Sequence, residues 1–154
     1  MAPLIVMLVG WVIFRALGLS GVWSWADSWS DALRVALAAM FMFTAVSHFH
    51  RRTRLDLIRM VPERLPAASF LVTATGVLEL AGAVGLLVPR AAAIAAYALA
   101  ALLVAMFPAN VHAARAGLIV VGRRATPLVW RLPLQLFWIV SLCWAANSLG
   151  RGPR

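Results

Sequence analysis

Residues 91–111 of the chain, AAAIAAYALAALLVAMFPANV, contain no charged side chain, and the next charge along the sequence is Arg115. A helix needs about 20 mostly apolar residues to cross the hydrocarbon core of a bilayer. This run meets that requirement, and it lacks the alternation of polar and apolar residues that a strand of a membrane barrel would show. The stretch therefore predicts a transmembrane helix and an integral membrane protein.

The composition of the whole chain agrees with this prediction. Of the 154 residues, 64% are hydrophobic and 12% are charged, whereas a soluble domain usually has about 45–50% apolar and roughly 25% charged residues. The single cysteine, Cys143, has no second cysteine with which to form an internal disulfide. These figures exclude an ordinary soluble enzyme, a disordered chain and a disulfide-bonded scaffold.

Four further segments are long and apolar enough to cross a membrane. A single membrane domain over residues 1–154 is therefore predicted to contain five spans, at about 3–19, 32–49, 66–88, 91–111 and 133–149. The first span has no basic region before it and no small-residue cleavage site after it, so we expect it to be retained. The predicted fold is all-α, a polytopic membrane helix bundle.

The arginines between the spans predict the orientation of the chain in the plasma membrane. The loops at 50–66 and 112–131 hold nine arginines, and the opposite side holds four, namely Arg34, Arg90, Arg151 and Arg154. Because cytoplasmic loops are enriched in basic residues, we expect a cytoplasmic N-terminus and a C-terminus outside. Basic residues in such short gaps indicate contact with the lipid bilayer rather than with nucleic acid.

Glu79 is the most informative polar residue inside a predicted span. It lies near the middle of the third span, and its helical neighbours are small, namely Thr75, Gly76, Gly82 and Ala83. Faces of small residues pack closely on other helices, and a charged group at this depth is costly unless it has a partner. We therefore expect Glu79 to point into the bundle.

Arg15 is the partner that the sequence suggests for Glu79. At about 1.5 Å per helical residue, the two lie ~18 Å and ~16 Å from the cytoplasmic edge, which is consistent with a buried structural ion pair. The alternative is that the Arg15 side chain extends outward toward Asp27 or Asp31. The sequence leaves both arrangements open.

A second polar group is predicted where three spans meet the cytoplasmic edge. His48 and His50 end the second span, Asn110 and His112 end the fourth, and Arg131 and Gln135 open the fifth. Such residues can bind a headgroup or a quinone ring, or they can simply cap helix ends. The candidate ligand-binding residues are His48, Glu79, Asn110, His112, Arg131 and Gln135. No metal site is predicted, because the histidines lack ligand spacing.

Several stretches carry a resemblance to a known family. They are residues 34–49 with their Ser-His-Phe ending, LIRMVP at 57–62, TGVLELAGAVGLLVP at 75–89, MFPANVHAA at 106–114 and RLPLQ at 131–135. Over about residues 32–147 the chain resembles the DoxX family of small bacterial membrane proteins. The resemblance implies a four-helix core, here with one added N-terminal span. It also implies that the candidate residues above form the buried polar set of that family.

The resemblance implies a redox context as well. Relatives include a subunit of an archaeal thiosulfate:quinone oxidoreductase and a mycobacterial protein that assembles with redox-protective partners. One hypothesis is therefore a quinone-linked subunit or accessory of a membrane oxidoreductase complex. In it His48, Asn110, His112 and Gln135 bind a quinone carbonyl and Arg131 stabilises negative charge. No cofactor motif is evident, so the electrons would come from a partner protein.

Two other functions fit the same residues. The first is a non-catalytic assembly or scaffold protein, in which the buried polar cluster fixes helix register and contacts to a membrane protein partner. The second is a proton relay or transporter around Glu79. The short chain without paired broken helices disfavours this role unless the protein forms homo-oligomers. The sequence leaves open whether the protein is an enzyme.

Overall fold

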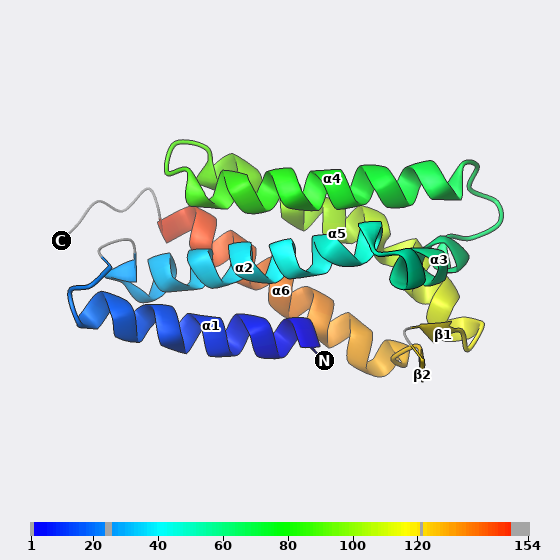
Figure 1. The fold of residues 1–154 in the computed structure, drawn as a ribbon, viewed down its shortest axis with the longest axis horizontal. Coiled ribbons are helices and arrows are strands. Elements are labelled where there is room, and N and C mark those ends of the chain that lie inside the picture. Colours follow the sequence, from blue (N-terminus) through cyan, green and yellow to red (C-terminus); the bar gives the residue numbers. More distant parts are fainter. Residues whose placement is uncertain (1, 24–25, 121, 149–154) are drawn as a thin grey trace.

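The computed structural model describes residues 2–23, 26–120 and 122–148. Within these ranges the chain forms six helices and one antiparallel hairpin (Figure 1): α1 (Ala2–Leu19), α2 (Trp29–Phe49), α3 (Arg51–Met60), α4 (Ala68–Leu87), α5 (Ala92–Arg115), β1 (Ile119–Val120), β2 (Arg123–Arg124) and α6 (Leu128–Ser148). The described residues do not include Arg151 and Arg154, which were counted for the predicted orientation, or residue 149 of the fifth predicted span.

Five of these helices, α1, α2, α4, α5 and α6, are long and apolar enough to cross a membrane. Each overlaps one of the five predicted spans, with ends that differ by up to five residues, so the prediction of an all-α, multi-pass membrane protein is confirmed. α2 begins at Trp29, earlier than predicted, because Ser28 caps it: the Ser28 hydroxyl accepts the Asp31 N–H at 3.0 Å.

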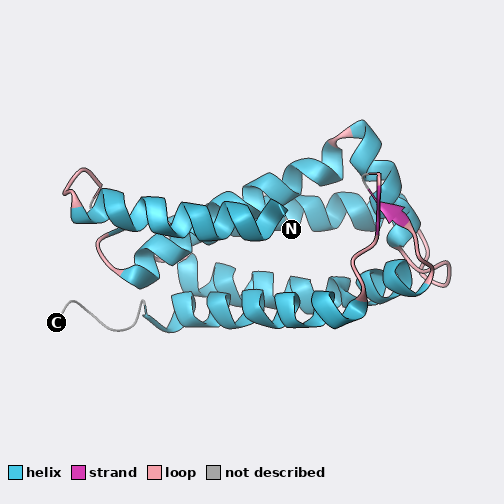
Figure 2. Cartoon of the chain, turned by 90° about the horizontal axis from the view of Figure 1, so that it is seen from below, coloured by secondary structure: helices cyan, strands magenta, loops and turns pink. Residues whose placement is uncertain are grey.

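α2, α4, α5 and α6 form a closed four-helix arrangement, in which α2 packs on α4, α4 on α5, α5 on α6 and α6 on α2. Among the described elements, the backbone of α1 lies against α2 alone. Viewed from below, the helix that begins at the N-terminus and the helix that leads to the C-terminus lie in separate layers (Figure 2). The bundle is therefore a four-helix core with α1 added outside α2.

Glycines on α4 allow its neighbours to approach closely. A Cβ atom at Gly76 would lie 2.5 Å from the Cβ of His48 on α2, and one at Gly82 would lie 2.5 Å from the side chain of Leu99 on α5. The small-residue face predicted around Glu79 thus contacts two helices.

The short helix α3 and the β1–β2 hairpin lie at the same end of the bundle (Figure 1). Arg54 of α3 donates hydrogen bonds to the His48 carbonyl at 3.0 Å and to the Thr73 hydroxyl at 2.9 Å. His112 of α5 is bonded through Nδ1 to the Met60 carbonyl at 3.1 Å. These bonds fix α3 across the ends of α2, α4 and α5.

A buried arginine joins α2 to α4 at the opposite end. Arg34, 7% exposed, donates from Nη1 to the Leu86 carbonyl and from Nη2 to Asp31 Oδ1, both at 3.3 Å. The last carbonyls of a helix have no partner within the helix, and Arg34 supplies one for α4. This contact was not predicted from the sequence, where Arg34 served only as a marker of orientation.

Arg34→Met is therefore expected to lower the free energy of unfolding by about 1.5 kcal/mol, because the Leu86 carbonyl loses a charged donor. Equilibrium unfolding in detergent micelles measures this loss. Arg52→Met, at an exposed position of α3, is the matched control and should change stability by less than about 0.5 kcal/mol. Equal losses in the two variants would contradict a role for Arg34 in joining the helices.

Candidate functional site

His48 of α2 and Glu79 of α4 face each other inside the bundle. His48 Nε2 and Glu79 Oε1 are 3.6 Å apart, and Thr44 donates a hydrogen bond to Glu79 Oε2 at 2.9 Å. The two residues are 7% and 4% exposed. Because a buried carboxyl group requires polar partners, these contacts explain how Glu79 is tolerated. The prediction that Glu79 points into the bundle is confirmed.

The orientation of the His48 ring follows from its other nitrogen. His48 Nδ1 lies 2.8 Å from the Val72 carbonyl oxygen, which can only accept a hydrogen bond, so Nδ1 carries a hydrogen. Because Nδ1 is bonded to Val72, the other ring nitrogen, His48 Nε2, is the atom that faces Glu79. The imidazole and the carboxyl group thus face each other across 3.6 Å, just beyond hydrogen-bond distance.

The predicted ion pair between Arg15 and Glu79 is not formed. α2 lies between α1 and α4, whose backbones do not touch among the described residues. The guanidinium carbon of Arg15 lies 5.5 Å from the ring centroid of Trp29, at the start of α2. The alternative prediction, in which the Arg15 side chain extends toward Asp27 or Asp31, gave the same end of the bundle. The side chain packs there on the ring of Trp29. The pair was predicted from the similar depths of the two residues in the membrane. Depth does not determine which helices are neighbours, and for this reason the predicted pair was wrong.

A second polar group joins α5 and α6. Arg131 of α6 donates from Nη1 to Asn110 Oδ1 of α5, and from Nε to the Thr126 carbonyl at 2.8 Å. One turn along α6, Gln135 donates to the Leu103 carbonyl at 2.9 Å. The structure therefore brings together three of the predicted site residues, Asn110, Arg131 and Gln135.

One cavity of about 870 Å³ includes both polar groups in its wall. We call it the polar cavity. Its polar lining residues are Thr44, Ser47, His48, Thr53, Glu79, Asn110, Thr126, Arg131 and Gln135. Five of the six predicted ligand-binding residues thus share one wall, inside the size range of small-molecule sites. Among the described residues, no three His, Cys, Asp or Glu side chains are grouped so that they could hold a metal ion.

His112 is the predicted residue that does not line the polar cavity. It lies two positions after Asn110 on α5, and residues two apart on a helix face different sides. Its ring bonds the Met60 carbonyl instead. The structure therefore corrects its expected role from ligand binding to joining α3 with α5.

Trp138 also lines the polar cavity, although it is not among the residues predicted for the site. Its indole Nε1 is buried and has no hydrogen-bond partner within the part of the chain that the structure describes. Trp138 follows Gln135 by three residues and Arg131 by seven, so all three share one face of α6. This spacing could have identified it.

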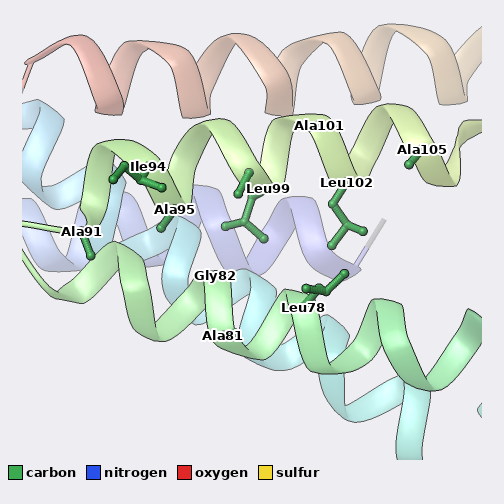
Figure 3. Close-up of a pocket in the computed structure, with 11 residues that line it drawn as sticks. Leu78, Ala81, Gly82, Ala91, Ile94, Ala95, Leu99, Ala101, Leu102 and Ala105 are labelled. Atoms are coloured by element: carbon green, nitrogen blue, oxygen red, sulfur yellow. The ribbon is translucent and has the colours of Figure 1, made fainter.

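A second hollow lies between α4 and α5 and differs in chemistry (Figure 3). This apolar groove of about 610 Å³ is lined only by glycine, alanine and aliphatic side chains, including Gly82, Ile94, Leu99 and Leu102. Because none of these side chains can form a hydrogen bond, the polar cavity is the candidate site.

The fold and the site define a multi-pass membrane protein with a polar-walled cavity among its spanning helices. The chain belongs to the family described as Domain of unknown function (DUF8561), whose model matches residues 37–147. That match contains both polar groups and leaves out α1. No curated protein and no solved structure matches the chain.

Proposed function

We propose that the protein binds a membrane quinone in the polar cavity, as a quinone-linked subunit or accessory of a membrane oxidoreductase complex. The observation that carries this proposal is that the cavity is lined by Trp138, whose indole N–H is buried and has no partner among the described residues. A buried donor without a partner is costly, and a carbonyl oxygen of a bound ligand would satisfy it. Quinones are apolar rings that carry such oxygens.

The two sides of the polar cavity offer different chemistry to a quinone. Trp138 of α6 supplies a donor for one carbonyl oxygen, and Arg131, two turns before it on the same helix face, places in the cavity wall a positive charge that stabilises negative charge on the ring. His48 and Glu79, on α2 and α4, hold a proton that can be exchanged with the other oxygen. These residues bind the ring and handle protons, and the electrons come from a redox centre of a partner protein.

The rest of the cavity wall suits an aromatic ring. Met40, Phe41, Phe43, Leu103 and Leu134 supply apolar surface beside the polar groups. Ligand sites are typically apolar with a few placed polar groups that fix orientation, and this lining has that composition.

A non-catalytic assembly or scaffold protein is the second candidate, and one observation favours it. Arg131, Asn110 and Gln135 already bond one another or the backbone and tie α5 to α6. Polar groups satisfied in this way fix helix register without any ligand. Binding measurements separate the two functions.

Fluorescence titration with a short-tailed benzoquinone is expected to show saturable quenching of tryptophan in the purified protein. Trp138→Phe should remove most of this quenching, whereas Trp130→Phe, at a position 61% exposed on α6, should retain it. Arg131→Gln is expected to raise the Kd about tenfold, because a charged donor is lost, and Arg115→Gln is its exposed control. Absence of saturable quenching in the wild type would favour the scaffold function.

We further propose a location for the protein and a relation to a known family. This location is the plasma membrane, with a cytoplasmic N-terminus and an outside C-terminus, and the exposed arginines of α3, Arg51, Arg52 and Arg59, support this orientation. The resemblance to the DoxX family belongs to the same proposal, because the family shown for the chain carries no function of its own.

A further inference from the structure

α1 covers only part of the space between α2 and α6. It begins part of the way along α2, while α6 continues toward the end that holds α3 (Figure 1). Its first residues, Ala2 and Pro3, line the polar cavity. The start of α1 is therefore an edge of the cavity, although α1 lies outside the matched family domain.

Aromatic contacts hold α1 in this place. Trp11 donates from Nε1 to the Trp29 carbonyl at 2.8 Å, and its ring lies 5.8 Å from the ring of Trp144 on α6. Met7, between Trp11 and the start of the helix, is fully buried. α1 thus bridges α2 and α6 beyond the polar cavity, and its described part meets the cavity only at its first turn.

The cavity wall reaches the outer surface of the bundle next to the start of α1. Phe43 of α2 lines the polar cavity and is 48% exposed, and Ala2 is also exposed. Leu134 of α6 lines the cavity and is half-buried. Residues that face both a cavity and the outside mark an opening, and here all three lie on helices that are long and apolar enough to cross a membrane.

We propose that Ala2, Phe43 and Leu134 form a lateral mouth through which the ligand enters from the bilayer. The ligand is then a tailed amphiphile: its ring occupies the polar cavity and its apolar tail leaves through the mouth into the lipid. This inference rests on the proposed binding of a quinone, and it assigns to α1 the selection of tailed ligands.

The test compares a decyl-tailed benzoquinone with the same ring lacking a tail, by equilibrium binding to the full chain in nanodiscs. Ala2→Trp fills the mouth and is expected to weaken binding of the tailed quinone about tenfold, while binding of the tailless ring stays within about twofold. Val12→Trp adds the same side chain at a position of α1 that is 62% exposed and away from the mouth, and it should change neither affinity.

Circular dichroism and gel filtration establish that each variant is folded. Ala2→Leu, a smaller obstruction, replaces Ala2→Trp if the tryptophan variant does not fold, and the same selective loss is expected from it. If the wild type binds both quinones and the Ala2 variants bind them equally well, the mouth is wrong and quinone binding stands. If the wild type binds neither quinone, the proposed function fails and the mouth fails with it.

Discussion

Glu79→Ala is expected to lower the free energy of unfolding by about 3–5 kcal/mol, the usual cost of removing one member of a buried polar pair. The carboxyl group is the acceptor for the Thr44 hydroxyl and the partner of His48 Nε2, and the pair is almost fully buried. Without Glu79 the buried His48 Nε2 loses its charged neighbour and faces the space left by the carboxyl group, while the Thr44 hydroxyl keeps only the Phe41 carbonyl, at 3.1 Å, as an acceptor. Equilibrium unfolding in detergent micelles, monitored by circular dichroism, measures the loss.

Two further variants identify the source of that loss. His48→Phe combined with Glu79→Leu should recover most of the stability, because well-packed apolar residues often replace a buried pair at little cost. Arg15→Ala should add its own effect to that of Glu79→Ala without coupling, because the two residues lie on either side of α2. Strong coupling between Arg15 and Glu79 would contradict this packing.

The spanning helices could be predicted from the sequence, but their neighbours could not. A run such as residues 91–111 is apolar over the thickness of a bilayer, and this local property is sufficient to predict a helix. Which helices touch is a lateral property, decided by contacts such as that of Gly76 with His48. For this reason the depths of Arg15 and Glu79 were combined into a pair that the structure does not contain.

The site was predicted in part, for a related reason. Polar residues at the ends of three spans were correctly expected to converge, and His48, Asn110 and Gln135 line one cavity. His112 was included because it ends the same span, although helical spacing turns it toward α3. Trp138 was passed over because an aromatic residue in a span is ordinarily apolar packing, and only the structure shows its unpaired N–H.

Gly76→Ala is expected to lower the free energy of unfolding by about 3 kcal/mol, at the upper end of the usual cost of overpacking. The added Cβ would lie 2.5 Å from the Cβ of His48, and an atom so close to the backbone cannot move unless α2 moves. Gly82→Ala should cost less, because it meets the flexible side chain of Leu99. Equilibrium unfolding in detergent measures both changes.

Gly10→Ala is the matched control, because it makes the same chemical change in another spanning helix. Its Cβ would meet the nearest atoms at an ordinary 3.5 Å, so the higher helix propensity of alanine should raise stability by up to about 1 kcal/mol. Opposite signs of the stability change for Gly76→Ala and Gly10→Ala would show that the close approach of α2 and α4, rather than glycine as such, sets the effect.

The close approach of α2 and α4 also brings His48 to Glu79. The loss of stability in the double variant of Gly76→Ala and Glu79→Ala should therefore be smaller than the sum of the two single losses. Full additivity would mean that the pair forms independently of the glycine contact.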